Sequence, residues 1–146
     1  MDTPRTALVT GGNRGIGLAI CEGLAERGLD VVMASRNEDR GEGAAASIRR
    51  RGGSVRVEQL DVIETASIEA CKERLDADDV TVDALVNNAG VYPDADALEA
   101  TIDQLDQAWT VNTRGPWLMV KAFVPDMIER GYGRVVNVSS GSGSFG

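Results

Sequence analysis

Short apolar runs alternate with helical patterns along the chain. The runs are rich in β-branched residues and predict strands at Thr6 to Thr10, Asp30 to Ser35, Ser54 to Leu60, Asp83 to Asn88 and Arg134 to Ser139. Apolar residues at helical spacing predict helices at Ile16 to Leu24 with an end at Gly28, Asn37 to Arg51, Ile68 to Leu75, and about Thr101 to Arg130. Strands that alternate with helices predict right-handed βαβ units. We therefore expect an α/β fold, a doubly wound parallel sheet with helices on both faces.

Glycine, proline and cysteine residues refine this pattern. Gly41 and Gly43 weaken the start of the second predicted helix, and Pro125 predicts a kink or a local gap in the hydrogen bonding of the last one. Cys71 shares a helical face with Ile68 and Leu75. Both cysteines, Cys21 and Cys71, are therefore predicted to be packed thiols rather than a disulfide or a metal pair.

Length and composition predict a single globular domain. The chain has 146 residues, 42% of them hydrophobic, and no apolar run long enough to span a bilayer. Its first residues, MDTPRTALV, lack the pattern of a signal peptide. We therefore expect a cytoplasmic protein that does not enter a membrane.

Charge and residue usage exclude several classes of function. The net charge of −8 argues against a nucleic-acid partner, because phosphate backbones require a basic surface. The one basic run, Arg49 to Arg51, falls where a helix should end, and cations are favourable there. The chain has no histidine, which excludes Ser/His/Asp triads and imidazole metal sites. No metal site is expected.

A glycine-rich segment follows the first predicted strand. Gly11, Gly15 and Gly17 form the pattern T-G-x-x-x-G-x-G at the turn into the first helix. Such glycines let the backbone turn tightly and let a dinucleotide pyrophosphate approach the helix N-terminus. An ordinary tight turn is the alternative.

Five motifs in this order resemble the short-chain dehydrogenases/reductases, in their single-domain branch. They are TGGNRGIG (Thr10 to Gly17), LDV (Leu60 to Val62), NNAG (Asn87 to Gly90), VNTRG (Val111 to Gly115) and GRVVNVSS (Gly133 to Ser140). The opening TGGNRGIGLAI looks most like the carbonyl-reductase-like members. The resemblance implies a Rossmann-type sheet with strand order 3-2-1-4-5 in the portion given.

The resemblance also implies a set of cofactor-binding positions. Gly11, Gly15 and Gly17, with Asn13, Arg14 and Ile16, match the pyrophosphate loop. Asp61 and Val62 match the positions that contact adenine, although Asp61 could instead cap the loop after the third strand. Asn88, Ala89 and Gly90 match a segment that leaves room beside the adenosine ribose, in which the asparagine also ties adjacent strands.

Two arginines predict a preference for NADP(H) over NAD(H). A free 2′-hydroxyl usually meets a carboxylate at the end of the second strand, whereas a 2′-phosphate requires cations. Arg36 stands where that carboxylate would be, and Arg14 precedes Gly15 in the glycine loop. Either arginine could instead be an ordinary surface charge, but basic residues at both positions also mark NADP(H)-preferring members of the family.

The family's chemistry uses Asn, Ser, Tyr and Lys. Asn112 and Ser140 match the first two catalytic positions, with Ser139 as the neighbouring alternative to Ser140. The tyrosine and lysine are missing, because no Y-x-x-x-K occurs in the chain and the family places it beyond the serine. We therefore expect residues 1–146 to be the cofactor-binding portion of a longer enzyme, inactive alone.

The expected function of the complete chain is hydride transfer between the nicotinamide of NADP(H) and a small carbonyl or secondary alcohol. We expect the complete protein to form a homo-oligomer through the long predicted helix, 101–130. The alternative is a short, non-catalytic protein that binds a dinucleotide as a sensor or interaction module.

Overall fold

A five-stranded parallel sheet forms the centre of the molecule. The computed structural model describes residues 4–141. The strands are β1 (Thr6–Thr10), β2 (Asp30–Ser35), β3 (Val55–Gln59), β4 (Ala84–Asn87) and β5 (Arg134–Asn137), and their order in the sheet is β3-β2-β1-β4-β5. Each neighbouring pair is parallel. The predicted fold class and strand order are confirmed.

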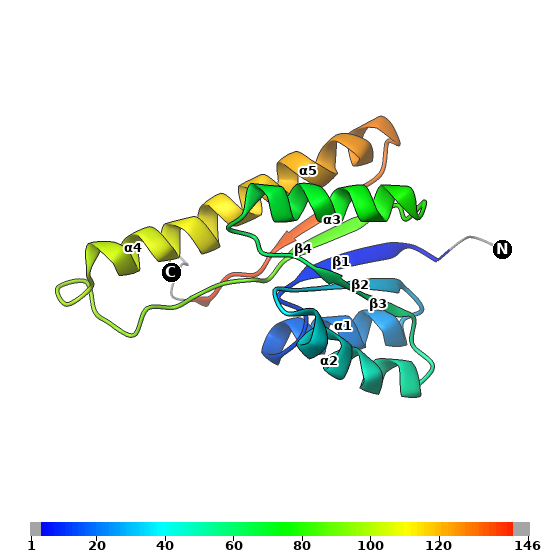
Figure 1. The fold of residues 1–146 in the computed structure, drawn as a ribbon, viewed down its shortest axis with the longest axis horizontal. Helices are drawn as coiled ribbons and strands as arrows, with labels where there is room; N and C mark the ends of the chain where they lie inside the picture. Colours follow the sequence, from blue (N-terminus) through cyan, green and yellow to red (C-terminus); the bar gives the residue numbers. More distant parts are fainter. Residues whose placement is uncertain (1–3, 142–146) are drawn as a thin grey trace.

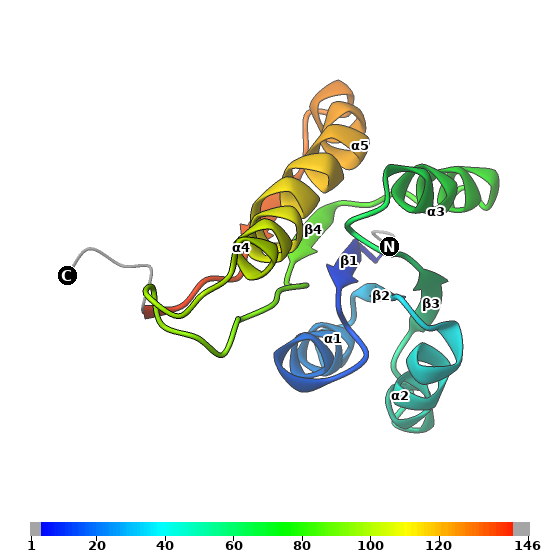
Figure 2. The same cartoon turned by 60° about the vertical axis from the view of Figure 1, so that its left-hand side comes forward.

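Helices cover both faces of the sheet (Figures 1 and 2). Helices α1 (Gly15–Glu26) and α2 (Glu38–Arg50) lie on one face, and α3 (Thr65–Ala77) and α5 (Gly115–Glu129) lie on the other. Helix α4 (Ile102–Trp109) projects beyond the sheet, after the loop that follows β4. The central strand β1 is buried along its whole length, as expected for a parallel strand between two helix layers.

Helix α2 begins where the sequence predicts, and its first glycine has a packing role. Asn37 caps the helix by accepting a hydrogen bond from the Arg40 N–H on its side-chain oxygen, at 2.9 Å. A Cβ at Gly41 would lie 2.5 Å from Cγ1 of Val57 on β3. Gly41 therefore allows close contact between helix and sheet, whereas Gly43 faces open space.

The prediction of one helix from Thr101 to Arg130 is wrong in its middle. A π-helical segment, η1 (Thr110–Arg114), separates α4 from α5, and the Gly115 N–H donates to the Thr110 carbonyl. The physical reason lies in Pro116, because proline has no N–H for the bond that an α-helix would direct to the Asn112 carbonyl. Pro125, in contrast, lies within α5, which runs on to Glu129.

Two apolar clusters hold the layers together. Leu8 and Leu85 pack with α3 and α5 on one face, and Val9 and Met33 pack with α1 and α2 on the other. Cys21 and Cys71 are buried, free thiols, as predicted. Burial raises the pKa of each thiol to about 12, because the thiolate would lose its hydration.

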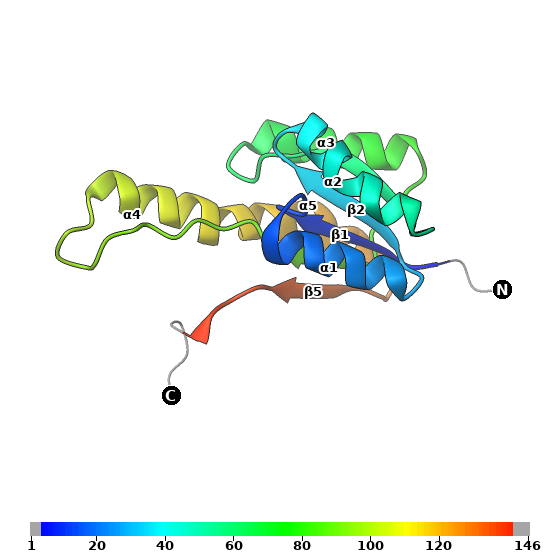
Figure 3. The ribbon, with the colours of Figure 1, turned by 90° about the horizontal axis from the view of Figure 1, so that it is seen from below.

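Strand β5 is exposed, at the edge of the sheet (Figure 3). Its valines alternate between the two faces, a pattern typical of a strand buried by two helix layers. In residues 4–141, however, Val135 and Val136 are 40% and 49% exposed. β5 pairs only with β4 in this part of the chain, so its outer edge and much of its surface remain uncovered.

Candidate functional site

The carboxyl ends of the five parallel strands carry the predicted site residues. The turn after β1 holds Gly11 to Arg14, the turn after β2 holds Arg36, and the loop after β3 holds Asp61 and Val62. Asn88 to Gly90 follow β4, and Ser139 and Ser140 follow β5. Parallel strands end at the same edge of a sheet, which is where ligands bind in open α/β folds.

The first glycine turn is shaped by close approach. Gly11 and Gly15 have positive φ angles of 62° and 55°, a region that favours glycine. A Cβ on Gly17 would lie 2.2 Å from the Gly11 carbonyl oxygen and 2.4 Å from the side-chain nitrogen of Asn88. Gly17 is therefore required for the packing of α1 against the turn. A Cβ on Gly15, in contrast, would meet no atom within 4 Å, so this glycine faces open space.

Asn88 and Thr10 fix the carbonyls of this turn. The Asn88 side-chain nitrogen donates to the carbonyls of Thr10 and Gly11, at 3.0 and 3.3 Å. The Thr10 hydroxyl accepts from the N–H groups of Asn88 and Ala89, both at 3.0 Å. The asparagine therefore links β1 to β4, as expected. Thr10 was not singled out from the sequence, although its place beside Gly11 in the first motif was the available signal.

Helix α1 begins without a protein cap. Its N-cap residue, Arg14, makes no side-chain capping bond, and no acidic residue occupies the first turn. The first N–H groups of a helix have no partner within the helix and carry its positive dipole end. Arg14, Gly15 and Ile16 are exposed at this position, and Asn13 is half-buried. The N-terminus of α1 can thus accept an anion.

The guanidinium groups of Arg14 and Arg36 make no hydrogen bond or ion pair with residues 4–141. Both residues are exposed, Arg14 at the start of α1 and Arg36 directly after β2. Arg36 is engaged only through its backbone carbonyl, which accepts from the Gln59 side chain at 3.4 Å. Both cations are therefore available to an added phosphate group.

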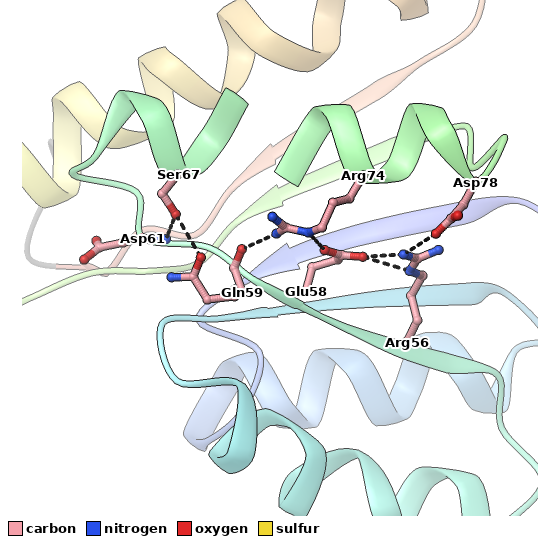
Figure 4. Close-up of polar contacts among 7 residues, drawn as sticks. All are labelled: Arg56, Glu58, Gln59, Asp61, Ser67, Arg74 and Asp78. Atoms are coloured by element: carbon pink, nitrogen blue, oxygen red, sulfur yellow. Dashed lines mark hydrogen bonds and ion pairs between the residues drawn. The ribbon is translucent and has the colours of Figure 1, made fainter. Parts of the chain in front are cut away.

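The loop after β3 is held by short-range hydrogen bonds (Figure 4). Oδ1 of Asp61 accepts from the Ile63 N–H at 3.2 Å, and the Asp61 N–H donates to the Ser67 hydroxyl at 2.9 Å. Asp61 thus caps its own loop, which was the alternative to a role in binding. The cap uses one carboxylate oxygen, and the other makes no hydrogen bond within the described residues. Val62 is buried, and a Cβ on Gly115 would lie 3.1 Å from its side chain.

Asn112 lies in the π-helical segment and binds the loop after β4. Its side-chain oxygen accepts from the Val91 N–H at 2.8 Å, and its side-chain nitrogen donates to the Val91 carbonyl at 2.7 Å. A Cβ on Gly90 would be 3.3 Å from the same oxygen. Both polar atoms of the Asn112 side chain are therefore engaged in holding the loop after β4.

Ser139 and Ser140 are both exposed beyond β5. No hydrogen bond joins either serine to Asn112 within the described residues. Just before them, the Asn87 side-chain nitrogen donates to Oδ1 of Asn137 at 2.9 Å, which links β4 to β5. The structure therefore brings the two serines to the same edge of the sheet as Asn112 and the glycine turn.

The described residues were also searched for membrane-spanning helices and for metal sites. Within residues 4–141, no helix is both long enough and apolar enough to cross a bilayer. The same residues contain no group of three or more Cys, Asp or Glu side chains placed to hold a metal ion.

Comparisons with known proteins agree with this architecture. A relative from Arabidopsis thaliana, (+)-neomenthol dehydrogenase, is 37% identical and matches 99% of this chain but 56% of its own length. The structure of a gluconate 5-dehydrogenase from Burkholderia cenocepacia J2315, in complex with NADP and tartrate, superposes with a TM-score of 0.87 at 35% identity, over 93% of this chain and 53% of that one.

A metagenomic short-chain oxidoreductase in complex with NADP gives a TM-score of 0.85 at 32% identity, over 93% of this chain and 62% of that one. The chain thus spans about half the length of the curated relatives it matches. The family described as short chain dehydrogenase matches residues 5–146. With its parallel sheet, its glycine turn and these relatives, the chain belongs to the short-chain dehydrogenase/reductase family of oxidoreductases.

Proposed function

We propose that residues 1–146 form the NADP(H)-binding Rossmann-type domain of a carbonyl-reductase-like oxidoreductase. The observation that carries this proposal is the turn between β1 and α1. Gly17 packs against it too closely for any side chain, Gly15 leaves its outer side open, and α1 begins without a protein cap. This combination fits a pyrophosphate held by Gly11, Asn13, Gly15, Ile16 and Gly17.

Arg14 and Arg36 support NADP(H) as the preferred cofactor. Their guanidinium groups are unpaired in the described part of the chain, and a 2′-phosphate between the β1 and β2 turns would meet both. Each charge-assisted contact contributes about 1.5–3 kcal/mol when well formed. Two structural neighbours are complexes with NADP, which is consistent with this preference.

We propose that the adenosine half lies between the loops after β2, β3 and β4. The carboxylate oxygen of Asp61 that is not used in its loop would accept a hydrogen bond from the adenine amino group, with Val62 contributing backbone contact. Ala89 and Gly90 are small and leave room for the ribose. Asn88 serves this site by fixing the carbonyls of the glycine turn.

The proposed chemistry is hydride transfer to or from the carbon of a carbonyl or secondary alcohol. When bound, NADP(H) supplies or accepts that hydride at its nicotinamide ring. The Ser140 hydroxyl would hold the substrate oxygen, with Ser139 as the alternative. The Asn112 carbonyl, to which Pro116 cannot donate, would hold a water of the proton relay.

We propose that the tyrosine and lysine of this family's chemistry lie outside residues 1–146, and that these residues alone do not turn over substrate. The exposed valines of β5 support this proposal, because a further layer of protein would bury them. Exposed apolar residues on α4 and α5, including Trp109 and Trp117, suit a second copy of the protein. A cytoplasmic location stays a prediction.

The substrate is proposed only as a class. The relatives' names describe dehydrogenases of dissimilar compounds, neomenthol and gluconate. Titration of the full-length protein with NADPH and NADH, followed by nicotinamide fluorescence, tests the proposal directly. We expect tighter binding of NADPH, and the absence of binding by either nucleotide would refute the function. The intact mass of the native protein separates the proposed enzyme from the short sensor, whose mass would be 15.5 kDa.

A further inference from the structure

A chain of side-chain hydrogen bonds joins two loops of the proposed adenosine site. The Asp61 N–H donates to the Ser67 hydroxyl at 2.9 Å, and this hydroxyl donates to Oε1 of Gln59 at 3.3 Å (Figure 4). At its other end, Nε2 of Gln59 donates to the Arg36 carbonyl at 3.4 Å. Two side chains thus connect the loop that carries Asp61 to the turn that carries Arg36.

The two backbone groups at the ends of this series of hydrogen bonds set the direction of every bond between them. The backbone N–H of Asp61 can only donate, and the backbone carbonyl of Arg36 can only accept. Between them, a hydroxyl accepts and donates through one atom, and a primary amide accepts on one atom and donates from another. Ser67 and Gln59 satisfy this sequence of donors and acceptors.

The same two residues are anchored on rigid elements. Ser67 lies in the first turn of α3, and Gln59 is the last residue of β3. Nη2 of Arg74, also on α3, donates to the Gln59 carbonyl at 2.8 Å, while its Nε pairs with the buried carboxylate of Glu58 at 2.7 Å. Helix and strand therefore hold the linking side chains from both sides (Figure 4).

We propose that Ser67 and Gln59 are positioning residues for the adenosine end of the cofactor site. This inference rests on the proposed function. Ser67 fixes the Asp61 backbone, and the Asp61 carboxylate points away from Gln59 and Ser67 (Figure 4). Gln59 fixes the backbone at Arg36, whose guanidinium is proposed to meet the 2′-phosphate.

The test uses fragments of the cofactor and the full-length protein. Adenosine 2′,5′-bisphosphate probes the adenosine end, and nicotinamide mononucleotide probes the other end. The variants are Ser67→Ala, Ser67→Thr, which keeps the hydroxyl, and Gln59→Met, which keeps the length of the side chain without its amide. Ser47→Ala is the matched control, because the half-buried Ser47 bonds only within α2, to the Ala44 carbonyl at 3.1 Å.

We expect Ser67→Ala and Gln59→Met each to weaken binding of adenosine 2′,5′-bisphosphate by about fivefold to tenfold, the effect of one hydrogen bond. Ser67→Thr and Ser47→Ala should bind it normally, and all variants should bind nicotinamide mononucleotide normally. Thermal melting of each variant reports whether it folds. If Ser67→Ala does not fold, Gln59→Met, which removes the next hydrogen bond of the same series, still tests the inference.

Unchanged binding of the bisphosphate by the folded Ser67→Ala and Gln59→Met variants would overturn the inference and leave the proposed function intact. Equal weakening of both fragments would also overturn it, because that result indicates a general structural role. Failure of the unaltered protein to bind the bisphosphate would overturn the proposed function and the inference together.

Discussion

The side chain of Asn112 and the backbone of Val91 exchange two hydrogen bonds, of 2.8 and 2.7 Å, between the π-helical segment and the loop after β4. A primary amide is suited to this exchange because it donates and accepts at once. The contact holds Gly90 and Val91 against the side chain of Asn112.

Asn112→Ala should therefore loosen the loop after β4. Both hydrogen bonds are lost, so exchange of the Val91 amide proton should become about tenfold faster, while exchange in β1 stays unchanged. Amide hydrogen exchange read by NMR measures both. Gln107→Ala, at an exposed position on α4, is the control. Equal protection of Val91 in the Asn112→Ala variant would show that the contact does not order this loop.

Gly17→Ala and Gly43→Ala should have opposite effects on stability. A methyl group at position 17 would overlap the Gly11 carbonyl oxygen at 2.2 Å, so we expect a loss of about 2 kcal/mol or more and of nucleotide binding. Gly43 is helical and has open space around it, and alanine there should stabilise the protein by about 0.5–1 kcal/mol. Urea denaturation measures both, and a well-tolerated Gly17→Ala would refute the packing argument.

Arg36→Asp should shift cofactor preference from NADPH toward NADH. The carboxylate repels a 2′-phosphate and can accept a hydrogen bond from a free 2′-hydroxyl. We expect NADPH binding to weaken by at least about tenfold, from the loss of one charge-assisted contact. Fluorescence titration measures both affinities. Arg50→Asp makes the same change of charge at the exposed far end of α2 and should leave them unaltered. Similar affinities of the unaltered protein for NADPH and NADH would contradict the proposed contacts of Arg14 and Arg36 with the 2′-phosphate.

The two thiols should resist alkylation in the folded protein. Burial raises the pKa of Cys21 and Cys71 to about 12 from 9.0, so iodoacetamide at pH 8 meets neither thiolate nor accessible sulfur. Mass spectrometry should find both labelled only after denaturation. Because the unfolded thiols lose their protons near pH 9 and the folded ones near 12, these groups should favour unfolding increasingly as pH rises through this interval. Rapid labelling of the native protein would contradict the prediction.

Glu58 should contribute more to stability than an exposed carboxylate with a similar partner. Its side chain is 4% exposed and pairs with Arg56 on the same strand and with Arg74 on α3, so that the second pair links β3 to α3 (Figure 4). We expect Glu58→Gln to lower the free energy of unfolding by about 1–3 kcal/mol. Glu42→Gln, which breaks an exposed pair with Arg49, should change it by less than about 0.5 kcal/mol. Urea denaturation measures both, and equal effects would contradict a special role for burial.

Periodicity in the sequence was enough to predict a parallel sheet with helices on both faces, whereas the strand order followed from the family resemblance. The strands β1 and β2 begin and end at the predicted residues, because each is a short apolar run between stretches with helical or turn patterns. The helix through Asn112 was predicted as continuous because its apolar spacing is continuous. The missing N–H of Pro116 was the local signal for the π-helical segment. Hydrophobic periodicity depends on side chains and does not detect a missing backbone donor.

The pattern of hydrophobic and polar residues could not predict side-chain contacts that form only in the folded protein. Gly41 is a helix-breaking residue in the sequence pattern, yet its lack of a side chain is what lets α2 pack against Val57 on β3. The link from Asp61 through Ser67 to Gln59 depends on side-chain directions that spacing does not encode. The predicted site residues do gather at one edge of the sheet, because parallel strands impose that arrangement. Their binding roles stay predictions.

The bonds from Asn88 to the carbonyls of Thr10 and Gly11 join residues 78 and 77 positions apart. The first strand, turn and helix are neighbours in sequence, and their mutual contacts can form early in folding. The final shape of the glycine turn, however, has to await the arrival of β4 beside β1, since such distant contacts close a long loop. During synthesis, the Thr10 and Gly11 carbonyls can therefore gain these bonds only after residue 88 has emerged from the ribosome, well after the first strand and helix are available to fold.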